Sequence, residues 1–410
     1  MKKLLVVALA SVLCAAFAVP ASAVEHEFGG YWRTRAYTVD NWTGTDSGSN
    51  ALVDTRTRLY YTAKFSDDFK LVNKFEFNNI WGDNVGGNVG TDGTGIFRIK
   101  HSYADFNTLG MNFKMGLQGA VVGRAFIFDD DFAGLVVTKE MGDNSFSATW
   151  MKVSDDAAYI APYFARNADT GDIEEIPAEP LPERDYYILS ANLNLNDTLA
   201  VSPYLLFDKE ESTDTAVYTL GADIDAKVGE ASVWSSLAYQ AGETEDMDNA
   251  GYLIAVGADA GIVHGQMFYA SGDDDEDDGD IDSFEPAHGH AYYWAEILGF
   301  GTFDNSTAFA TSPNGTISNV MALNIGTTLK PMDKLTVNAD LWYAQLVEDA
   351  TFGTDEENEL GIELDVKATY QVLDNLNLDL IAAYLIAGDA VAGDDTEDVM
   401  EYGARMSLSF

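Results

Sequence analysis

The chain has 410 residues and carries 67 Asp and Glu against 23 Lys and Arg, a formal net charge of −44. So negative a surface argues against nucleic acid or anionic lipid headgroups as partners. A content of 12% aromatic and 47% hydrophobic residues argues against a disordered acidic chain. The single cysteine, Cys14, excludes a disulfide framework and a cysteine-based metal site.

The first 23 residues have the pattern of a secretory signal peptide. A positive start at Lys2 and Lys3 is followed by an apolar run over residues 4–19 and by a small-residue cleavage site, Ala-Ser-Ala, at 21–23. We therefore expect cleavage before Val24 and an exported chain. No later apolar run reaches the ~18–20 residues of a membrane-spanning helix.

After Val24 the chain repeats one pattern, in which apolar and polar residues alternate over about ten positions before a turn. The pattern is clear over 187–195, 335–343, 358–372 and 376–386. In the second of these stretches Leu335, Val337 and Ala339 alternate with polar residues. Strands of ~9–11 residues have the length that crosses a bilayer at a tilt.

The connections alternate between short and long. Short turns are expected near 66–69, 109–111, 142–144, 196–197, 227–230, 261, 330–334 and 373–375, and long loops near 39–53, 81–95, 119–133, 154–184, 209–215, 242–249, 272–318, 348–357 and 388–397. A soluble β-sandwich has no reason for this parity, whereas transmembrane barrels have short periplasmic turns and longer external loops. The sequence therefore predicts one all-β domain over residues 24–410, a transmembrane antiparallel β-barrel of 18 strands, with 16 as the alternative.

The last expected strand carries an apolar stripe that ends on a C-terminal aromatic residue. The stripe consists of Tyr402, Ala404, Met406, Leu408 and Phe410. It resembles the terminal signature by which outer-membrane barrels are recognised for assembly. Together with the signal peptide, it predicts the outer membrane of a Gram-negative bacterium as the location and outer-membrane lipid as a partner.

Positive charge is concentrated in the first four expected strands, where seven cations occupy one face. They are Arg33, Arg35, Arg56, Arg58, Lys74, Arg98 and Lys100. The opposite face is apolar and includes Phe97, Ile99 and Tyr103, which we expect to face lipid. A cation on the lipid face costs about 2–4 kcal/mol near the bilayer midplane. The seven are therefore expected to form a basic ladder in the lumen; the alternative is that they only pair with carboxylates such as Asp54 and Glu76.

The expected third external loop, 119–133, is less polar than the other long loops and ends in an acidic run. If it were exposed, its bulky apolar residues would be an aggregation liability, so we expect it to fold into the lumen. Here the chain resembles the general diffusion porins of Gram-negative outer membranes, whose third loop folds inward and sets acidic residues against a basic wall. The resemblance implies that Asp129, Asp130 and Asp131 face the cations, and that the protein is a homotrimer. The 18 strands depart from general porins and are favoured by substrate-selective barrels.

These features predict a water-filled pore constriction, formed by the three aspartates and the seven cations, for passive diffusion of small hydrophilic solutes and ions. Such a channel is no enzyme and requires no cofactor. An outer-membrane barrel enzyme, a hydrolase, is one alternative, and a calcium-dependent surface structural protein is another.

The calcium alternative rests on the acidic stretch 273–285 in the seventh expected loop. From Asp274 it approximates a calcium-loop pattern, with Asp278 and Glu285 as further ligands, but Glu replaces Asp or Asn at the third position and flanking helices are missing. A solvated acidic loop is the competing interpretation.

Overall fold

The computed structural model describes residues 24–410 apart from 84–86, 88, 90–95, 155–162, 167–172, 177–182, 276–278, 288–291, 305–308 and 310–315. The expected signal peptide, residues 1–23, lies outside the described residues. In the part of the chain that is described, no helix is long and apolar enough to cross a membrane.

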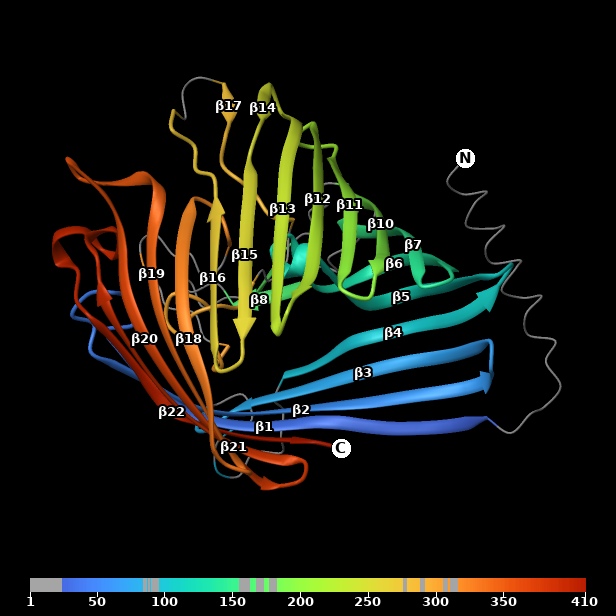
Figure 1. The fold of residues 1–410 in the computed structure, drawn as a ribbon, viewed down its shortest axis with the longest axis horizontal. Coiled ribbons are helices and arrows are strands. Elements are labelled where there is room, and N and C mark those ends of the chain that lie inside the picture. The colour runs from blue at the N-terminus through green and yellow to red at the C-terminus, as the bar shows by residue number, and fades with distance from the viewer. Residues whose placement is uncertain are drawn as a thin grey trace.

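Eighteen long strands form one closed antiparallel barrel, which confirms the predicted fold and strand number (Figure 1). The wall strands are β1 (Glu25–Asp40), β2 (Ser49–Ser66), β3 (Phe69–Ile80), β4 (Ile96–Thr108), β5 (Met111–Val122), β6 (Phe128–Met141), β7 (Asn144–Ser154), β10 (Arg184–Asn196), β11 (Leu199–Glu210), β12 (Thr215–Val228), β13 (Ala231–Thr244), β15 (Tyr252–Ala260), β16 (Val263–Ala270), β18 (Val320–Met332), β19 (Leu335–Phe352), β20 (Asp355–Leu373), β21 (Leu376–Ala387) and β22 (Val399–Ser409).

The remaining elements are short and belong to the connections. They are the hairpin of β8 (Tyr163–Arg166) with β9 (Ile173–Ile176), the parallel pair of β14 (Met247–Asn249) with β17 (Asp280–Ile281), and the 3-10 turns η1 (Gly123–Ala125), η2 (Asp389–Val391) and η3 (Gly393–Asp395). Because β16 pairs directly with β18, the long segment between them contributes no strand to the wall.

The eight expected short turns all fall between consecutive wall strands. Several of the expected long loops are shorter than predicted, and the one between β19 and β20 is no longer than a short turn. Only residues 211–214 separate β11 from β12, and only 353–354 separate β19 from β20. These strands continue past the apolar band, where both faces are polar and the period-two signal disappears.

Residues alternate between the two faces of the wall along regular stretches of strand, as residues 362–366 of β20 illustrate. Glu363 is fully buried and Asp365 is 7% exposed inside the barrel, whereas Ile362, Leu364 and Val366 point outward and are exposed. In a soluble protein such an outer surface would be a liability, but in a membrane it is the face that lipid covers. Polar residues are therefore collected in the lumen.

The barrel closes where the last strand meets the first. β22 pairs with β21 on one side and with β1 on the other, from Tyr31 opposite Ser409 to Asp40 opposite Met400. Beyond the strand, the amide of Gly30 donates to the carbonyl of Phe410 at 2.8 Å, and the amide of Phe410 donates to the carbonyl of Gly30 at 3.1 Å. A methyl group on Gly30 would lie 2.5 Å from the Phe410 ring, so the glycine makes room for this aromatic side chain.

Deleting Phe410 removes both closing hydrogen bonds and the ring that packs on Gly30. We expect the amount of protein in the outer membrane to fall more than the conductance of each inserted channel, because the residue acts in assembly and lies away from the lumen. Quantifying the protein in purified outer membranes checks this, with Phe410→Tyr as the control that keeps the aromatic ring. Normal outer-membrane levels of the deletion variant would contradict this role of the last strand.

Candidate functional site

A two-stranded hairpin, residues 118–132, leaves the wall and enters the barrel. β5 and β6 pair without interruption from Asn112 opposite Thr138 to Val122 opposite Phe128. The pairing of β5 with β4 ends at Leu117, and that of β6 with β7 ends at Ala133. Beyond those points the two arms have only each other as strand partners among the described residues. We call this segment the lumen hairpin.

The tip of the lumen hairpin packs against the opposite wall. The Arg124 guanidinium bonds Asp225 of β12 at 2.7 Å and lies 4.9 Å from the ring centroid of Trp234 on β13. Phe126 is fully buried and stacks on Tyr292 at 4.1 Å between ring centroids. The apolar residues at 126–128 thus fill the space between the tip and the far wall. The loop expected at 119–133 is largely a β-hairpin, whose two arms satisfy their backbone groups by pairing with each other.

A second segment inside the barrel comes from the long connection between β16 and β18. In this inner loop, residues 292–304, the amides of Ile297 and Leu298 donate to the Glu363 carboxylate at 2.6 and 2.9 Å. Arg405 of β22 donates to the carbonyl of Thr302 at 2.8 Å. The inner loop is therefore fixed to the interior of β20 and β22. The sequence alone did not predict its position.

The cations of β1 and β2 are held by carboxylates of neighbouring strands. Arg35 and Asp54 form an ion pair of 2.7 Å, as do Arg58 and Glu76. Arg56 approaches Glu76 at 3.6 Å. The alternative considered from the sequence, pairing with Asp54 and Glu76, therefore describes much of this wall. These pairs lie between cross-strand neighbours, so the antiparallel register itself brings them together.

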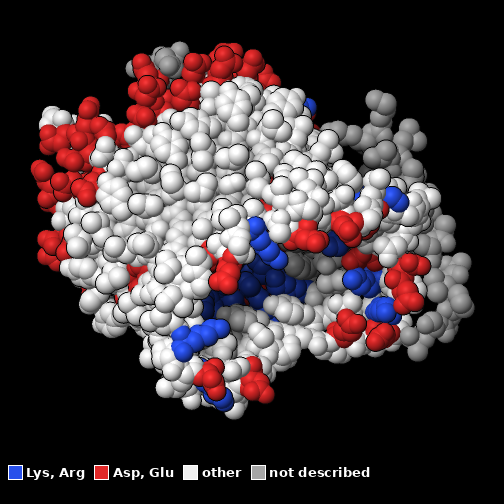
Figure 2. Space-filling model, in the orientation of Figure 1, with Lys and Arg blue, Asp and Glu red and all other residues white. Residues whose placement is uncertain are grey.

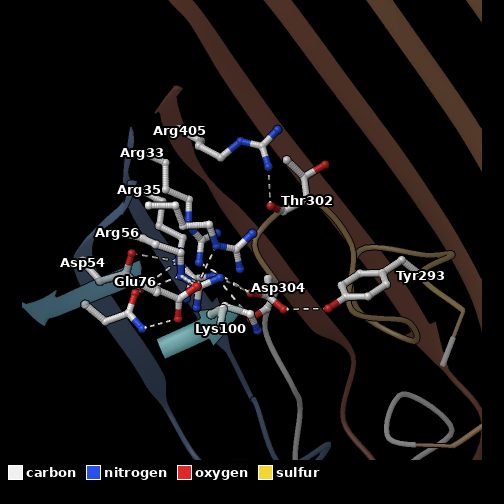
Figure 3. A network of polar contacts seen from close by, with 12 residues as sticks. Arg33, Arg35, Asp54, Arg56, Glu76, Lys100, Tyr293, Thr302, Asp304 and Arg405 are labelled. Atoms are coloured by element: carbon white, nitrogen blue, oxygen red, sulfur yellow. Dashed lines mark hydrogen bonds and ion pairs between the residues drawn. The ribbon is translucent and has the colours of Figure 1, made fainter. Parts of the chain in front are cut away.

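Asp304, at the end of the inner loop, joins the cations of two strands (Figure 3). Its Oδ2 lies 3.2 Å from Arg56 and 3.5 Å from Arg33, and its backbone carbonyl accepts a bond of 3.3 Å from Arg35. The Tyr293 hydroxyl donates to Oδ1 at 3.0 Å. Burial and the adjacent Asp304 carboxylate raise the pKa of Tyr293, so the phenol keeps its proton and acts as a donor.

The acidic run of the lumen hairpin meets the ladder at Asp131. Its carboxylate contacts Lys100 at 2.5 Å and the imidazole of His101 at 3.0 Å. Consecutive residues of a regular strand point to opposite faces. Here Lys74 pairs with His101 and Phe75 with Ile99, so Lys100 is the extra residue of a β-bulge and both side chains reach the lumen.

Because of the bulge, the lipid-facing residues of β4 differ from those expected. After it, the odd-numbered residues face inward: Asp105 forms an ion pair of 3.3 Å with Lys70, and Tyr103 is the cross-strand neighbour of Val72 on the same face. Tyr103 was expected to face lipid and instead points into the lumen. Period two fails at this position because one inserted residue reverses every later side chain.

The hairpin, the inner loop and the basic wall enclose a cavity of about 600 Å³. Its lining includes eight of the ten predicted residues, namely Arg56, Arg58, Lys74, Arg98, Lys100, Asp129, Asp130 and Asp131. Arg33 and Arg35 are not in the lining; they are buried behind it and reach it through Asp304. Tyr293 and Asp304 were not among the predicted site residues, because no local sequence pattern marks a loop residue that enters a barrel.

Acidic residues gather at the upper and left edges of the molecular surface, while residues of both charges mix around a hollow lower down (Figure 2). Asp and Glu gather over the ends of β14 and β17 and over the far ends of β19 and β20, whereas Lys and Arg gather in a hollow of the same view. The acidic rim therefore belongs to the connections between strands, and the basic groups belong to the interior.

The predicted calcium ligands are only partly described, because Asp278 lies outside the described residues. Asp274 is exposed, and the Glu285 carboxylate accepts a bond of 3.1 Å from Ser318. Among the described residues, no group of three or more His, Cys, Asp or Glu side chains is placed to hold a metal ion. Calcium binding by residues 273–285 stays a prediction.

Comparison with known proteins gives a family and a fold. Residues 25–404 match the family model described as alginate export. Among solved structures, OpdK of Pseudomonas aeruginosa with vanillate has a TM-score of 0.60 at 12% identity, covering 94% of this chain and 98% of that one. OccK5 (OpdH) of the same organism gives 0.56 at 13% identity with the same coverage. A BenF-like porin from Pseudomonas fluorescens Pf-5 gives 0.59 at 10% identity, covering 94% and 99%. No curated protein matches the chain.

Arg124→Ala removes both contacts that fasten the tip of the lumen hairpin. A partly exposed ion pair contributes up to about 1 kcal/mol, and a cation–π contact about 0.5–2 kcal/mol. We expect the tip to leave the far wall more often, seen as added flicker in single-channel current recordings. Asp225→Asn should give part of this effect. Lys139→Ala is the control, because Lys139 lies at the other end of β6 and donates to the Gly110 carbonyl. A current as quiet as that of the unmodified protein would show that Arg124 does not hold the tip.

Proposed function

The chain belongs to the alginate export family, and from this we propose that it forms a water-filled channel in the outer membrane through which small hydrophilic solutes and ions diffuse. The observation that carries the proposal is the polar cavity inside an 18-stranded barrel, bounded by cations on one side and by the carboxylates of the lumen hairpin on the other. A barrel of this size has an interior wide enough for water as well as side chains.

The mechanism requires no chemical step. Fixed cations on β2 to β4 and fixed carboxylates on β6 produce a transverse electric field across the cavity. Polar solutes exchange part of their hydration for these charges, while apolar solutes gain no such compensation and are held back. The fields of the wall and of the acidic rim oppose each other for an ion, so selectivity depends on how far salt screens the rim.

One solved structure and the family description bear on which solute crosses the channel. The OpdK structure is that of a complex with vanillate, a small carboxylate, and the family is described by the export of alginate, a polyanion. Both names agree with cations such as Arg56 and Arg98 in the lining. A second candidate function is therefore the passage of an anionic polysaccharide, favoured by cations at successive heights along β1 to β4. Measuring how fast uronate oligomers and single sugar acids cross the channel distinguishes passage of a polysaccharide from diffusion of small solutes.

Export, oligomeric state and the competing enzyme function remain to be considered. We propose export through a cleaved signal peptide and a homotrimer, as the resemblance to porins implies. The hydrolase alternative predicts substrate cleavage without conductance, whereas the channel predicts a stable aqueous conductance in a planar lipid bilayer. Recording single channels from the purified protein separates them.

Neutralising Asp129, Asp130 and Asp131 together, each to Asn, tests the constriction. The unmodified channel should be weakly cation-selective at low salt, and this preference should fade as salt rises, because the rim is screened beyond a Debye length of about 10 Å at 0.1 M. The variant leaves Lys100 without its carboxylate partner. Its reversal potential should therefore move towards anions at every salt concentration, and its conductance should change.

The matched control replaces Asp273, Asp274 and Asp275 with Asn in the seventh connection. It removes the same charge from the rim, so its effect should disappear at high salt. If the hairpin variant keeps the reversal potential and conductance of the unmodified channel at all salt concentrations, then the three aspartates do not line the constriction.

A further inference from the structure

The arginine cluster around Asp304 holds one more positive charge than it has carboxylates. Arg33, Arg35, Arg56 and Arg58 face Asp54, Glu76 and Asp304, four cations against three anions. Arg33 is the least satisfied of the four. It is 4% exposed, its only ion pair among the described residues is the 3.5 Å contact with Asp304, and its Nε has no hydrogen-bond partner there. A buried guanidinium in this condition is short of an acceptor.

The Asp304 carboxylate contacts this cluster as a bound anion would. Its carboxylate comes from the inner loop, while its partners come from β1, β2 and the Tyr293 end of the loop (Figure 3). One oxygen is shared by two arginines, and the other accepts from the tyrosine hydroxyl. The residue has φ = +51°, a left-handed backbone conformation that aspartate adopts more readily than most residues other than glycine. Its carboxylate is still 26% exposed to the cavity, within reach of a competitor.

Resting on the proposed channel function, we propose that Arg33, Arg56 and Tyr293 form a carboxylate-binding site in the lumen, and that Asp304 occupies this site as a tethered competitor of carboxylated solutes. An incoming carboxylate takes the same three donors and can also accept from Arg33 Nε. Asp304 then turns towards the water of the cavity. Binding of the solute and release of the end of the inner loop are thus one exchange of carboxylates.

A tethered competitor lowers the apparent affinity for a free carboxylate by the fraction of time in which the site is open. If Asp304 holds the site about nine-tenths of the time, its removal tightens the apparent affinity about tenfold. Such weakening suits a channel, since a solute that binds tightly would leave slowly. Asp304 would therefore set the specificity and residence time for carboxylates, and it would not change the binding of neutral solutes.

The test measures benzoate binding to the purified barrel by calorimetry in detergent and, separately, by the block of single-channel current. Asp304→Asn and Asp304→Ala should both lower the half-saturating benzoate concentration about tenfold, while benzamide, the neutral analogue, shows no change. Adding Arg33→Gln to Asp304→Asn should abolish the gain. Asp259→Asn is the control, because it removes a carboxylate from a second lumen cavity beside β15, which shares Tyr293 with the proposed site but is not lined by Arg56 or Asp304. Each variant is first shown to keep its barrel by circular dichroism.

Benzoate affinity equal to that of the unmodified protein in both Asp304 variants would overturn the proposal, as would an equal gain in Asp259→Asn. Failure of the channel function is a different result: the unmodified protein would then show no conductance, whatever calorimetry reports for benzoate. A folded Asp304→Asn variant that conducts normally and binds benzoate no better than the unmodified protein would contradict the competitor role of Asp304. The same result would leave the proposed channel function standing.

Discussion

Within a bilayer every backbone N–H and C=O must find a partner inside the protein, and the rest of this structure depends on that constraint. A sheet can meet it only by closing on itself, which here requires β22 to pair with β1. Closure fixes an even number of strands with both ends on one side of the membrane, and it fixes an inside and an outside. Alternation along each strand then sorts the side chains, so that polar groups meet only in the lumen.

The lumen is not left as an open tube, because two segments are folded into it. The lumen hairpin satisfies its own backbone by pairing β5 with β6, and it fastens its apolar tip to the far wall. The inner loop instead uses the wall, where Glu363 accepts two of its amides. Both solutions avoid the same cost, because a backbone amide that is buried away from water must find a partner within the protein.

Charge balance explains why these segments carry acids. Breaking a buried ion pair by removing one partner costs about 3–5 kcal/mol, and buried cations such as Arg33 and Arg35 require carboxylates nearby. Register supplies Asp54 and Glu76 from neighbouring strands. The remaining carboxylates, Asp131 and Asp304, arrive on the hairpin and the inner loop. A cavity of mixed charge results, lined by five cations and five carboxylates, and it differs in character from the acidic rim.

The sequence by itself determined the barrel, its 18 strands, its short turns and the inward face of the cations, because period two is a local property and lipid penalises any other arrangement. That Asp129 to Asp131 face the cations was expected only from the resemblance to general porins, because no period along the chain relates this segment to the basic strands. Only the tertiary structure decided the bulge at Lys100, which turns His101 and Tyr103 inward, and the position of Asp304. A bulge depends on pairing between strands, and Asp304 is placed by contacts with residues about 250 or more positions away in the chain. No pattern of neighbouring residues encodes either of them.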